Sequence, residues 1–259
     1  MYSNKSHIHD LFYRFRNPTS TWGEPVIMAM DVGHSYNVPH ESSVEVTTDA
    51  FLKKKGYLFD CVDMCIDEGS IVCILGANGT GKSTLLDLLA GKEQPLEGKV
   101  HHAHNLTIGY FNQQMVDSLV EGEENSIHTP LSLLALKFPK STEQELRGEL
   151  TAFGLRSQQA TTNIKFLSGG ERCRLCLTVL MLSDPEVLIM DEPTSHLDVE
   201  SVDALIYGLK KWEGTLVMVS HDANFVRSLE GICFVLCQPD GKVLRVPNGI
   251  DYYLKSFKL

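Results

Sequence analysis

The segment GANGTGKS, Gly76–Ser83, constrains the fold of this chain more than any other part of its sequence. It satisfies the pattern G-x-x-x-x-G-K-[ST], in which glycines let backbone N–H groups wrap around phosphate groups. The lysine of such a loop, here Lys82, reaches the β- and γ-phosphates, and the hydroxyl of Ser83 can ligate Mg²⁺. Because the pattern is meaningful only between a strand and a helix, the flanking segments decide its interpretation.

Both flanks have the required character. SIVCILG before the loop is a short apolar run typical of a buried strand, and a helix with a leucine-rich face is expected from Lys82 to Ala90, ended by Gly91. The alternative, a chance match in a glycine-rich turn, lacks this context. The residues expected around the phosphates are Gly76, Ala77, Asn78, Gly79, Thr80, Gly81, Lys82, Ser83 and Thr84.

Two further apolar runs end in side chains suited to phosphate chemistry. VLIMDE ends in Asp191, expected to hold Mg²⁺ through water, and Glu192, expected to act as general base toward an attacking water. Alone, an Asp-Glu pair after a strand is more often the start of a loop, but a phosphate loop on the same chain makes it specific. His221 follows the run TLVMVS and is expected at the same sheet edge, near the γ-phosphate, although a lone histidine there is as often structural.

The order of apolar segments predicts an α/β layer fold. Strands are expected near 26–36, 57–69, 70–76, 106–111, 186–192 and 214–221, with a helix at 200–212 between the last two. The apolar spacing over 130–166 is helical, and another helix is expected from Ser168 to Leu182, so a helical subdomain is predicted over about 114–185. The first residues, up to about Pro25, read as an arm, and 38–56 reads as a polar loop.

The segment FLSGGERC, Phe166–Cys173, allows two interpretations. Ser168 and Glu171 have the spacing of a capping box at a helix start. The glycines between them leave backbone N–H groups uncovered at a helix N-terminus, which attracts negative charge, so the same turn can hold a phosphate. The residues alone leave both interpretations open.

Composition excludes few classes of protein. The net charge of −10 argues against a general nucleic-acid coat, because neutralising phosphates requires clustered Lys and Arg. No apolar run approaches the length of a membrane span and the first residues lack a signal-peptide core, so we expect a cytoplasmic protein without membrane contact. An odd number of cysteines, 7, indicates free thiols, and Cys173-x-x-Cys176 is interpreted as small buried side chains rather than a metal or redox site.

With these motifs in order, the chain resembles an ATP-binding cassette (ABC) domain from about residue 26 to its end. The resemblance implies a P-loop NTPase with a RecA-like core, an antiparallel β subdomain and the helical insertion, acting on ATP with Mg²⁺. It assigns adenine stacking to Tyr36, sensing of Mg²⁺ and water to Gln113, and contact across a cassette pair to Asp198. The signature that faces the ATP of the opposite site is Leu167, Ser168, Gly169, Gly170 and Glu171.

Finer resemblance points to the second cassette of ABC-F proteins, which have twin cassettes, no membrane domain and a role on ribosomes. It is carried by LLDLLAGKEQPLEGKVHHAHNLTIGYFNQ, FPKSTEQELRGELTAFGL, EPTSHLDVESVDALIYGL and VSHDANFV, and His196 before Leu-Asp fits this branch. One cassette is present where the family has two, and the first 25 residues resemble only the end of the inter-cassette linker. The chain therefore reads as a C-terminal half, a fragment or a reduced relative, and the 38–56 loop is longer than the family pattern requires.

The resemblance implies cassettes that pair head to tail, with each ATP between one phosphate loop and the other signature. A single chain should then bind ATP but hydrolyse it poorly. The expected partners are a second cassette and a ribosome or its RNA. The alternatives are a subunit that energises a membrane transporter and a scaffold that binds ATP without turnover, and the retention of Glu192 and His221 disfavours the latter.

Overall fold

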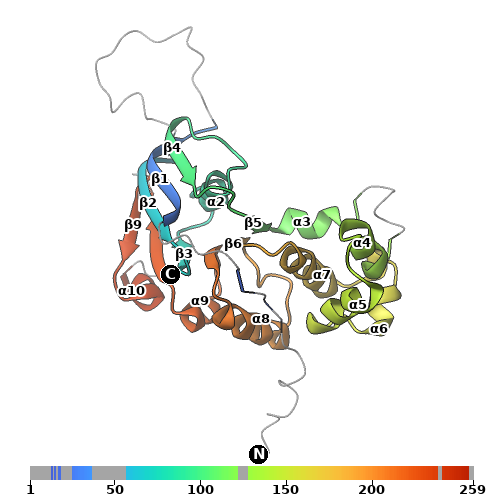
Figure 1. Cartoon of the computed structure of the whole chain (residues 1–259). Coiled ribbons are helices and arrows are strands. Elements are labelled where there is room, and N and C mark those ends of the chain that lie inside the picture. The colour runs from blue at the N-terminus through green and yellow to red at the C-terminus, as the bar shows by residue number, and fades with distance from the viewer. Residues whose placement is uncertain are drawn as a thin grey trace, which may run out of the picture.

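The computed structural model describes residues 13, 15, 17–18, 25–36, 57–121, 128–238 and 241–256. Two sheets lie beside a group of helices (Figure 1). Most of the expected arm and the whole 38–56 loop lie outside the described residues, so the predictions for them are not addressed.

The larger sheet has six strands and forms the centre of the fold. Its order is β5 (Ile108–Phe111), β6 (Val187–Asp191), β7 (Thr215–Val219), β3 (Ile71–Leu75), β8 (Ile232–Leu236) and β9 (Val243–Val246). The first five run parallel and β9 is antiparallel to β8. The prediction of buried parallel strands at β6 and β7 is confirmed, and Asp191 is paired with Val219 at their carboxyl ends.

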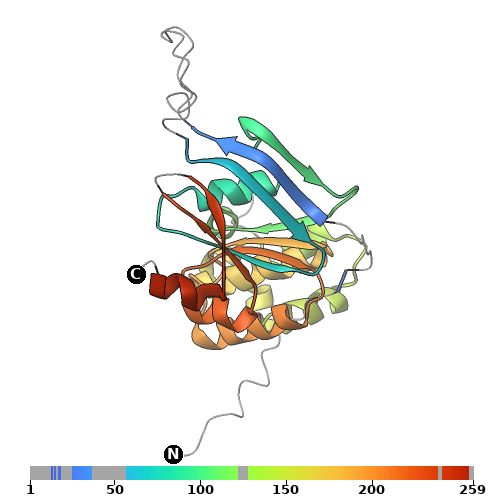
Figure 2. The same cartoon turned by 90° about the vertical axis from the view of Figure 1, so that its left-hand side faces the viewer.

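A three-stranded antiparallel sheet packs over one face of the larger sheet (Figure 2). It contains β2 (Phe59–Asp67), β1 (Pro25–His34) and β4 (Glu97–His102), in that order. Alternate residues such as Val62, Met64 and Ile66 point inward, as expected of strands with one buried face. They share an apolar cluster with the leucines of α2 (Lys82–Leu89) and with inward residues of β6 and β7.

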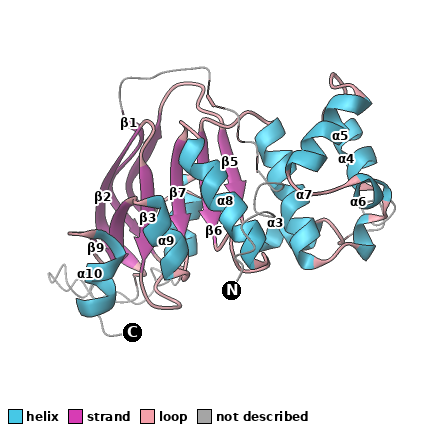
Figure 3. Cartoon of the chain, turned by 90° about the horizontal axis from the view of Figure 1, so that it is seen from below, coloured by secondary structure: helices cyan, strands magenta, loops and turns pink. Residues whose placement is uncertain are grey.

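Helices cover the opposite face and extend beyond one edge (Figure 3). They are α3 (Gln113–Ser118), α4 (Pro130–Lys137), α5 (Glu143–Ala152), α6 (Ser157–Thr161), the 3₁₀ turn η4 (Ile164–Phe166), α7 (Gly169–Leu182), α8 (Val199–Lys211), α9 (Ala223–Leu229) and α10 (Gly249–Ser256). The helix predicted from Ser168 to Leu182 is confirmed as α7. The predicted α/β layer fold is confirmed as well, and helices α3 to α7 lie close to the range predicted for the helical subdomain.

Helix α7 contributes to two apolar clusters. Cys176 and Leu177 pack with the central sheet, whereas Leu175 packs with α4, α5 and α6 in a separate cluster. Both cysteines of the C-x-x-C pair are buried. Burial raises the pKa of the Cys173 thiol to about 12 and also raises the pKa of the Cys176 thiol, so both are protonated side chains at neutral pH. The helical part of the chain thus has its own core and is joined to the sheet through α7.

Candidate functional site

The phosphate loop joins β3 to α2, in the context that its sequence pattern requires. Gly76, Gly79 and Gly81 have φ of 152°, 77° and 96°, a region that side chains disfavour. A Cβ on Gly76 would lie 2.9 Å from the carbonyl oxygen of Leu236, so this position also has no room for a side chain. The sequence therefore needs glycine here to expose the backbone of the loop.

Lys82 lies at the centre of the pocket. Its Nζ donates hydrogen bonds to the carbonyl oxygens of Gly76 and Ala77, at 3.0 and 2.9 Å. Burial lowers the pKa of Lys82, while the nearby carboxylates of Glu192 and Asp191 oppose that shift. A buried ammonium held by loop carbonyls, with the two carboxylates nearby, is a cation positioned for an anionic ligand.

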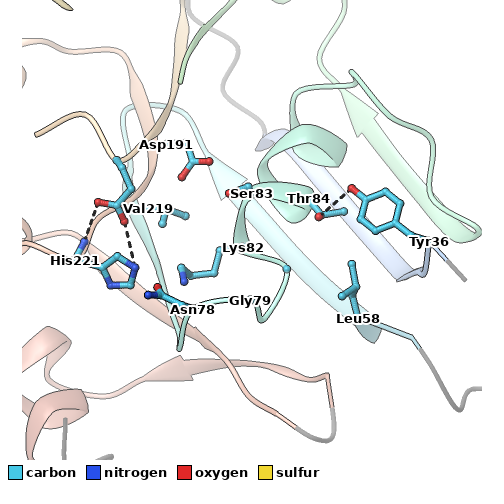
Figure 4. A pocket seen from close by; sticks show the side chains of 12 residues that line it. Tyr36, Leu58, Asn78, Gly79, Lys82, Ser83, Thr84, Asp191, Val219 and His221 are labelled. Atoms are coloured by element: carbon cyan, nitrogen blue, oxygen red, sulfur yellow. Dashed lines mark hydrogen bonds and ion pairs between the residues drawn. The ribbon is translucent and has the colours of Figure 1, made fainter. Parts of the chain in front are cut away.

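Glu192 follows β6 in a conformation that is unusual for a residue other than glycine, with φ of 49°. Its N–H donates to the carbonyl oxygen of Val219 at 3.0 Å, which ties the turn to β7. The N–H of His221 donates to Glu192 Oε2 at 3.2 Å, and His221 Nε2 lies 3.5 Å from Oε1 (Figure 4). The strained turn thus directs the carboxylate toward His221 and the pocket.

The environment makes Glu192 a stronger base than an exposed carboxylate. Burial raises its pKa, and the charge of Asp191 adds to that effect. The backbone N–H and imidazole of His221 and the charge of Lys82 oppose the shift without cancelling it. A raised pKa suits a general base that must accept a proton near neutral pH.

The pocket has a volume of about 550 Å³ and gathers half of the predicted site residues. Figure 4 shows Asp191 and His221 on one side of Lys82 and Tyr36 on the other. The lining consists of Tyr36, Leu58, Asn78, Gly79, Gly81, Lys82, Ser83, Thr84, Asp191, Glu192, Val219 and His221. The Ser83 hydroxyl and the Asp191 carboxylate in this lining are hard oxygen donors of the kind Mg²⁺ prefers, so the residues present fit this ion.

Tyr36 is part of the pocket lining, and 61% of its surface is exposed. Its hydroxyl is 3.1 Å from Thr84 Oγ1, and its ring meets that of His34 edge-on with centroids 5.1 Å apart. This exposed aromatic ring, beside the helix that follows the phosphate loop, is available to stack on a nucleotide base. Its role in stacking adenine stays a prediction.

Gln113 is not among the residues that line the pocket. It is the first residue of α3, and its Nε2 donates to both carboxylate oxygens of Asp117 at 3.1 Å. The side chain is therefore held along its own helix rather than toward Ser83 and Asp191. Its predicted contact with Mg²⁺ and water stays a prediction.

The signature turn lies apart from this pocket, at the start of α7. Glu171 N–H donates to Ser168 Oγ at 3.3 Å and Ser168 N–H donates to Glu171 Oε2 at 2.8 Å, which confirms the capping box. A Cβ on Gly169 would meet its nearest neighbour, the His196 ring, at 3.7 Å, whereas one on Gly170 would lie 3.1 Å from the His196 carbonyl oxygen. The cap is thus formed, and its phosphate-binding role stays a prediction.

Replacing Ser168 by Ala should lower the free energy of unfolding by about 1 kcal/mol, because the substitution removes the hydroxyl that caps α7. Urea denaturation monitored by circular dichroism measures the change. The matched control is Ser157→Ala at the exposed start of α6, which should change stability by less than about 0.5 kcal/mol. Equal effects of both substitutions would contradict the capping role.

Asp198 lies outside the pocket and caps α8 by accepting the N–H of Ser201 at 2.8 Å. Burial alone would raise the pKa of Asp198, but hydrogen bonds from Ser201 and the charge of Arg174 prevail and lower it. Arg174 on α7 donates to Ser201 Oγ at 3.0 Å, which links the signature helix to α8. The sequence alone did not predict this link. It also did not predict that Leu58 and Val219 line the pocket, because an aliphatic residue near a strand end gives no functional signal.

Comparison with known proteins identifies the family. The family model described as ABC transporter matches residues 59–195, more than half of the chain. The chain belongs to the ABC transporter family. This cassette is 36% identical over 237 residues to ATP-binding cassette sub-family F member 3 of Rattus norvegicus, covering 91% of the chain and 32% of that relative.

Two further curated relatives match this chain at a similar level of identity. ABC transporter F family member 4 of Arabidopsis thaliana is 36% identical over 257 residues, which cover 96% of this chain and 33% of the relative. The probable ATP-binding protein YheS of Escherichia coli K12 is 39% identical over 171 residues, covering 66% of this chain and 26% of the relative. The cassette thus spans about a third or less of the length of these relatives.

Solved structures agree on the fold. The ATP-binding cassette MJ0796, described as a dimer in a post-hydrolysis state with ADP and Pi, superposes with a TM-score of 0.62 at 23% identity. The match covers 84% of this chain and 96% of that structure, and a second dimeric MJ0796 structure gives a TM-score of 0.63. In the ranges that the structure describes, the helices are too short or too polar to cross a membrane.

Proposed function

We propose that this cassette binds and hydrolyses ATP as one half of a cassette pair. The observation that carries the proposal is the arrangement of one pocket, in which Lys82, Ser83, Asp191, Glu192 and His221 converge while the signature turn lies elsewhere. A site that lacks its second phosphate-binding turn is completed when a second cassette supplies one. The dimeric state described for the MJ0796 structures is consistent with this arrangement.

Each residue of the pocket has a defined task in this proposal. The loop backbone and Lys82 hold the β- and γ-phosphates, and Ser83 and Asp191 would hold Mg²⁺, which supplies charge neutralisation for phosphoryl transfer. Glu192 orients the attacking water and accepts its proton. His221, 3.5 Å from the Glu192 carboxylate, keeps that base oriented and donates toward the γ-phosphate oxygens. Gln113 completes the set after leaving Asp117.

Pairing couples nucleotide state to conformation. Two γ-phosphates bridge the interface in the proposed pair, each contacting Gly169 and Gly170 of the opposite signature turn. Moving an open–closed equilibrium from 1:99 to 99:1 requires about 5.5 kcal/mol of differential binding, a reasonable demand on two charged bridges. Hydrolysis removes the bridges, and the pair opens.

We further propose that the closed pair binds ribosomes, a role supported by the similarity to sub-family F relatives over most of the chain. The ATP-trapped variant Glu192→Gln should sediment with purified ribosomes in ATP at least about tenfold more than in ADP. Sucrose-cushion sedimentation followed by immunoblotting measures the bound fraction. Lys82→Ala, which should not retain nucleotide, is the control and should not respond to ATP. Equal sedimentation of the trapped form in ATP and ADP would rule out the ribosomal role.

A further inference from the structure

A short N-terminal segment packs along α8, away from the nucleotide pocket. Figure 1 shows its described residues in dark blue between α8 and α7. Tyr13 is buried in the main apolar cluster, Phe15 is half-buried against it, and Asn17 Oδ1 accepts the N–H of Glu213 just beyond α8. The described side chains thus lie along the length of this helix.

Aromatic contacts join this segment to both parts of the cassette. The ring of Tyr13 stacks on Phe153, at the end of α5, with centroids 5.1 Å apart. Phe15 meets Phe153 edge-on at 6.0 Å and Trp212, at the end of α8, at 6.2 Å. Tyr13 and Phe15 therefore form an aromatic contact that connects the end of α5 with the end of α8.

Helix α8 has a glycine where the segment crosses it. A Cβ on Gly208 would lie 2.5 Å from the Phe15 ring and 2.8 Å from the carbonyl oxygen of Tyr13. Glycine inside a helix is less stable than alanine, so its position here is explained by the close approach of the segment. The substitution Gly208→Ala should displace the segment.

The hydroxyl of Tyr13 reaches a polar network. Burial raises the pKa of Tyr13 to about 12, while Ser201 and the charge of Arg174 act in the opposite direction, which places both groups close to the hydroxyl. Among the described atoms, the Tyr13 hydroxyl and Arg174 Nε are buried without a hydrogen-bond partner. Ser201 in turn holds Asp198 through its N–H and accepts from Arg174, whose guanidinium lies 3.8 Å from Asp198.

We propose that Tyr13 and Phe15 form an aromatic clasp that, through Ser201 and Arg174, positions Asp198 and the signature turn for the nucleotide of the second cassette. This inference rests on the proposed pairing for its consequence, but not for its geometry. Tyr13 is a positioning residue: it lies in the main apolar cluster and is not among the residues that line the nucleotide pocket.

Three variants of the full chain test the clasp. Tyr13→Phe keeps the stacked ring and removes the hydroxyl, and Gly208→Ala displaces the segment. The matched control is Gly148→Ala, a helical glycine in α5 whose added Cβ would meet no atom within 4 Å. Hydrogen exchange without nucleotide is followed by mass spectrometry in peptides covering 171–174, 201–204 and 76–84.

We expect about fivefold faster exchange at 171–174 and 201–204 in Tyr13→Phe, because this variant removes the hydroxyl that interacts with Ser201 and Arg174, and a larger increase in Gly208→Ala. Exchange at 76–84 should be unchanged, and Gly148→Ala should match the wild type. A clasp that only stabilises the fold would instead raise exchange in all peptides, and no change in either variant would equally overturn the proposal.

Turnover supplies the second readout. In cassette pairs, Tyr13→Phe should lower kcat several-fold and leave the affinity for ATP in its own pocket unchanged, because Asp198 and the signature face the partner's nucleotide. Equal losses in kcat and affinity would overturn positioning. If the wild-type pair hydrolyses no ATP, the proposed function fails, whereas the exchange experiment still decides whether the clasp exists.

Discussion

Glu192→Gln should lower ATP turnover by about 10²–10⁴-fold, the usual contribution of a positioned general base. The amide keeps the shape of the side chain and its acceptor for the His221 N–H, but it cannot take a proton from water. Nucleotide binding should persist because Lys82 and the loop backbone are intact. Release of phosphate by cassette pairs measures the loss, and size-exclusion chromatography in ATP should show an accumulated pair.

The matched control is Glu213→Gln, which makes the same change in charge at the amino end of β7, opposite the edge that holds His221. It should leave turnover within about twofold of the wild type. Residual turnover above a tenth of the wild-type rate in Glu192→Gln would contradict the assignment of the base.

Two inactive variants should restore activity when they are mixed. Lys82→Ala removes the cation at the phosphates, and Gly169→Asp places a carboxylate where the partner's γ-phosphate is expected, so each alone should lose about 10²-fold or more in turnover. Random pairing makes half of the pairs mixed, each with one intact site of two, so about a quarter of wild-type turnover should return. Phosphate release as a function of mixing ratio measures this, with a maximum expected at equal amounts.

The structure supports the choice of Gly169 for this experiment. An added Cβ there meets the His196 ring at 3.7 Å, an ordinary contact, and an acidic residue in the first turn of α7 favours the helix. Gly169→Ala is the control for size without charge and should lose far less activity. If the mixture stays inactive while each variant binds the partner, the composite site is ruled out.

The core elements were predictable because their apolar patterns are strong. β3, β6 and β7 are almost fully buried runs, and the leucines of α2 mark one broad face. β4 gave no such signal, since its residues are exposed or nearly so along its whole length. It is a strand because β1 pairs with it, which is a tertiary cause that a local pattern does not contain.

The site shows the same division. The sequence pattern predicted that Lys82, Asp191, Glu192 and His221 lie close together, because parallel strands end at one sheet edge, and all four line the same pocket. It did not predict that Gln113 would turn to Asp117, although a Gln and an Asp four residues apart on one helix commonly pair. The contacts of Tyr13 with α8 lay beyond prediction, since they join residues almost 190 positions apart.

The double packing of α7 has a mechanical meaning. Leu175 engages the helical cluster while Cys176 and Leu177, the next residues on the helix, engage the cluster against the sheet. Close-packed side chains transmit displacement, so α7 is coupled both to the helical cluster and to the cluster against the sheet. A displacement of α4, α5 or α6 should therefore move α7, and with it the signature turn at the start of α7, relative to the central sheet.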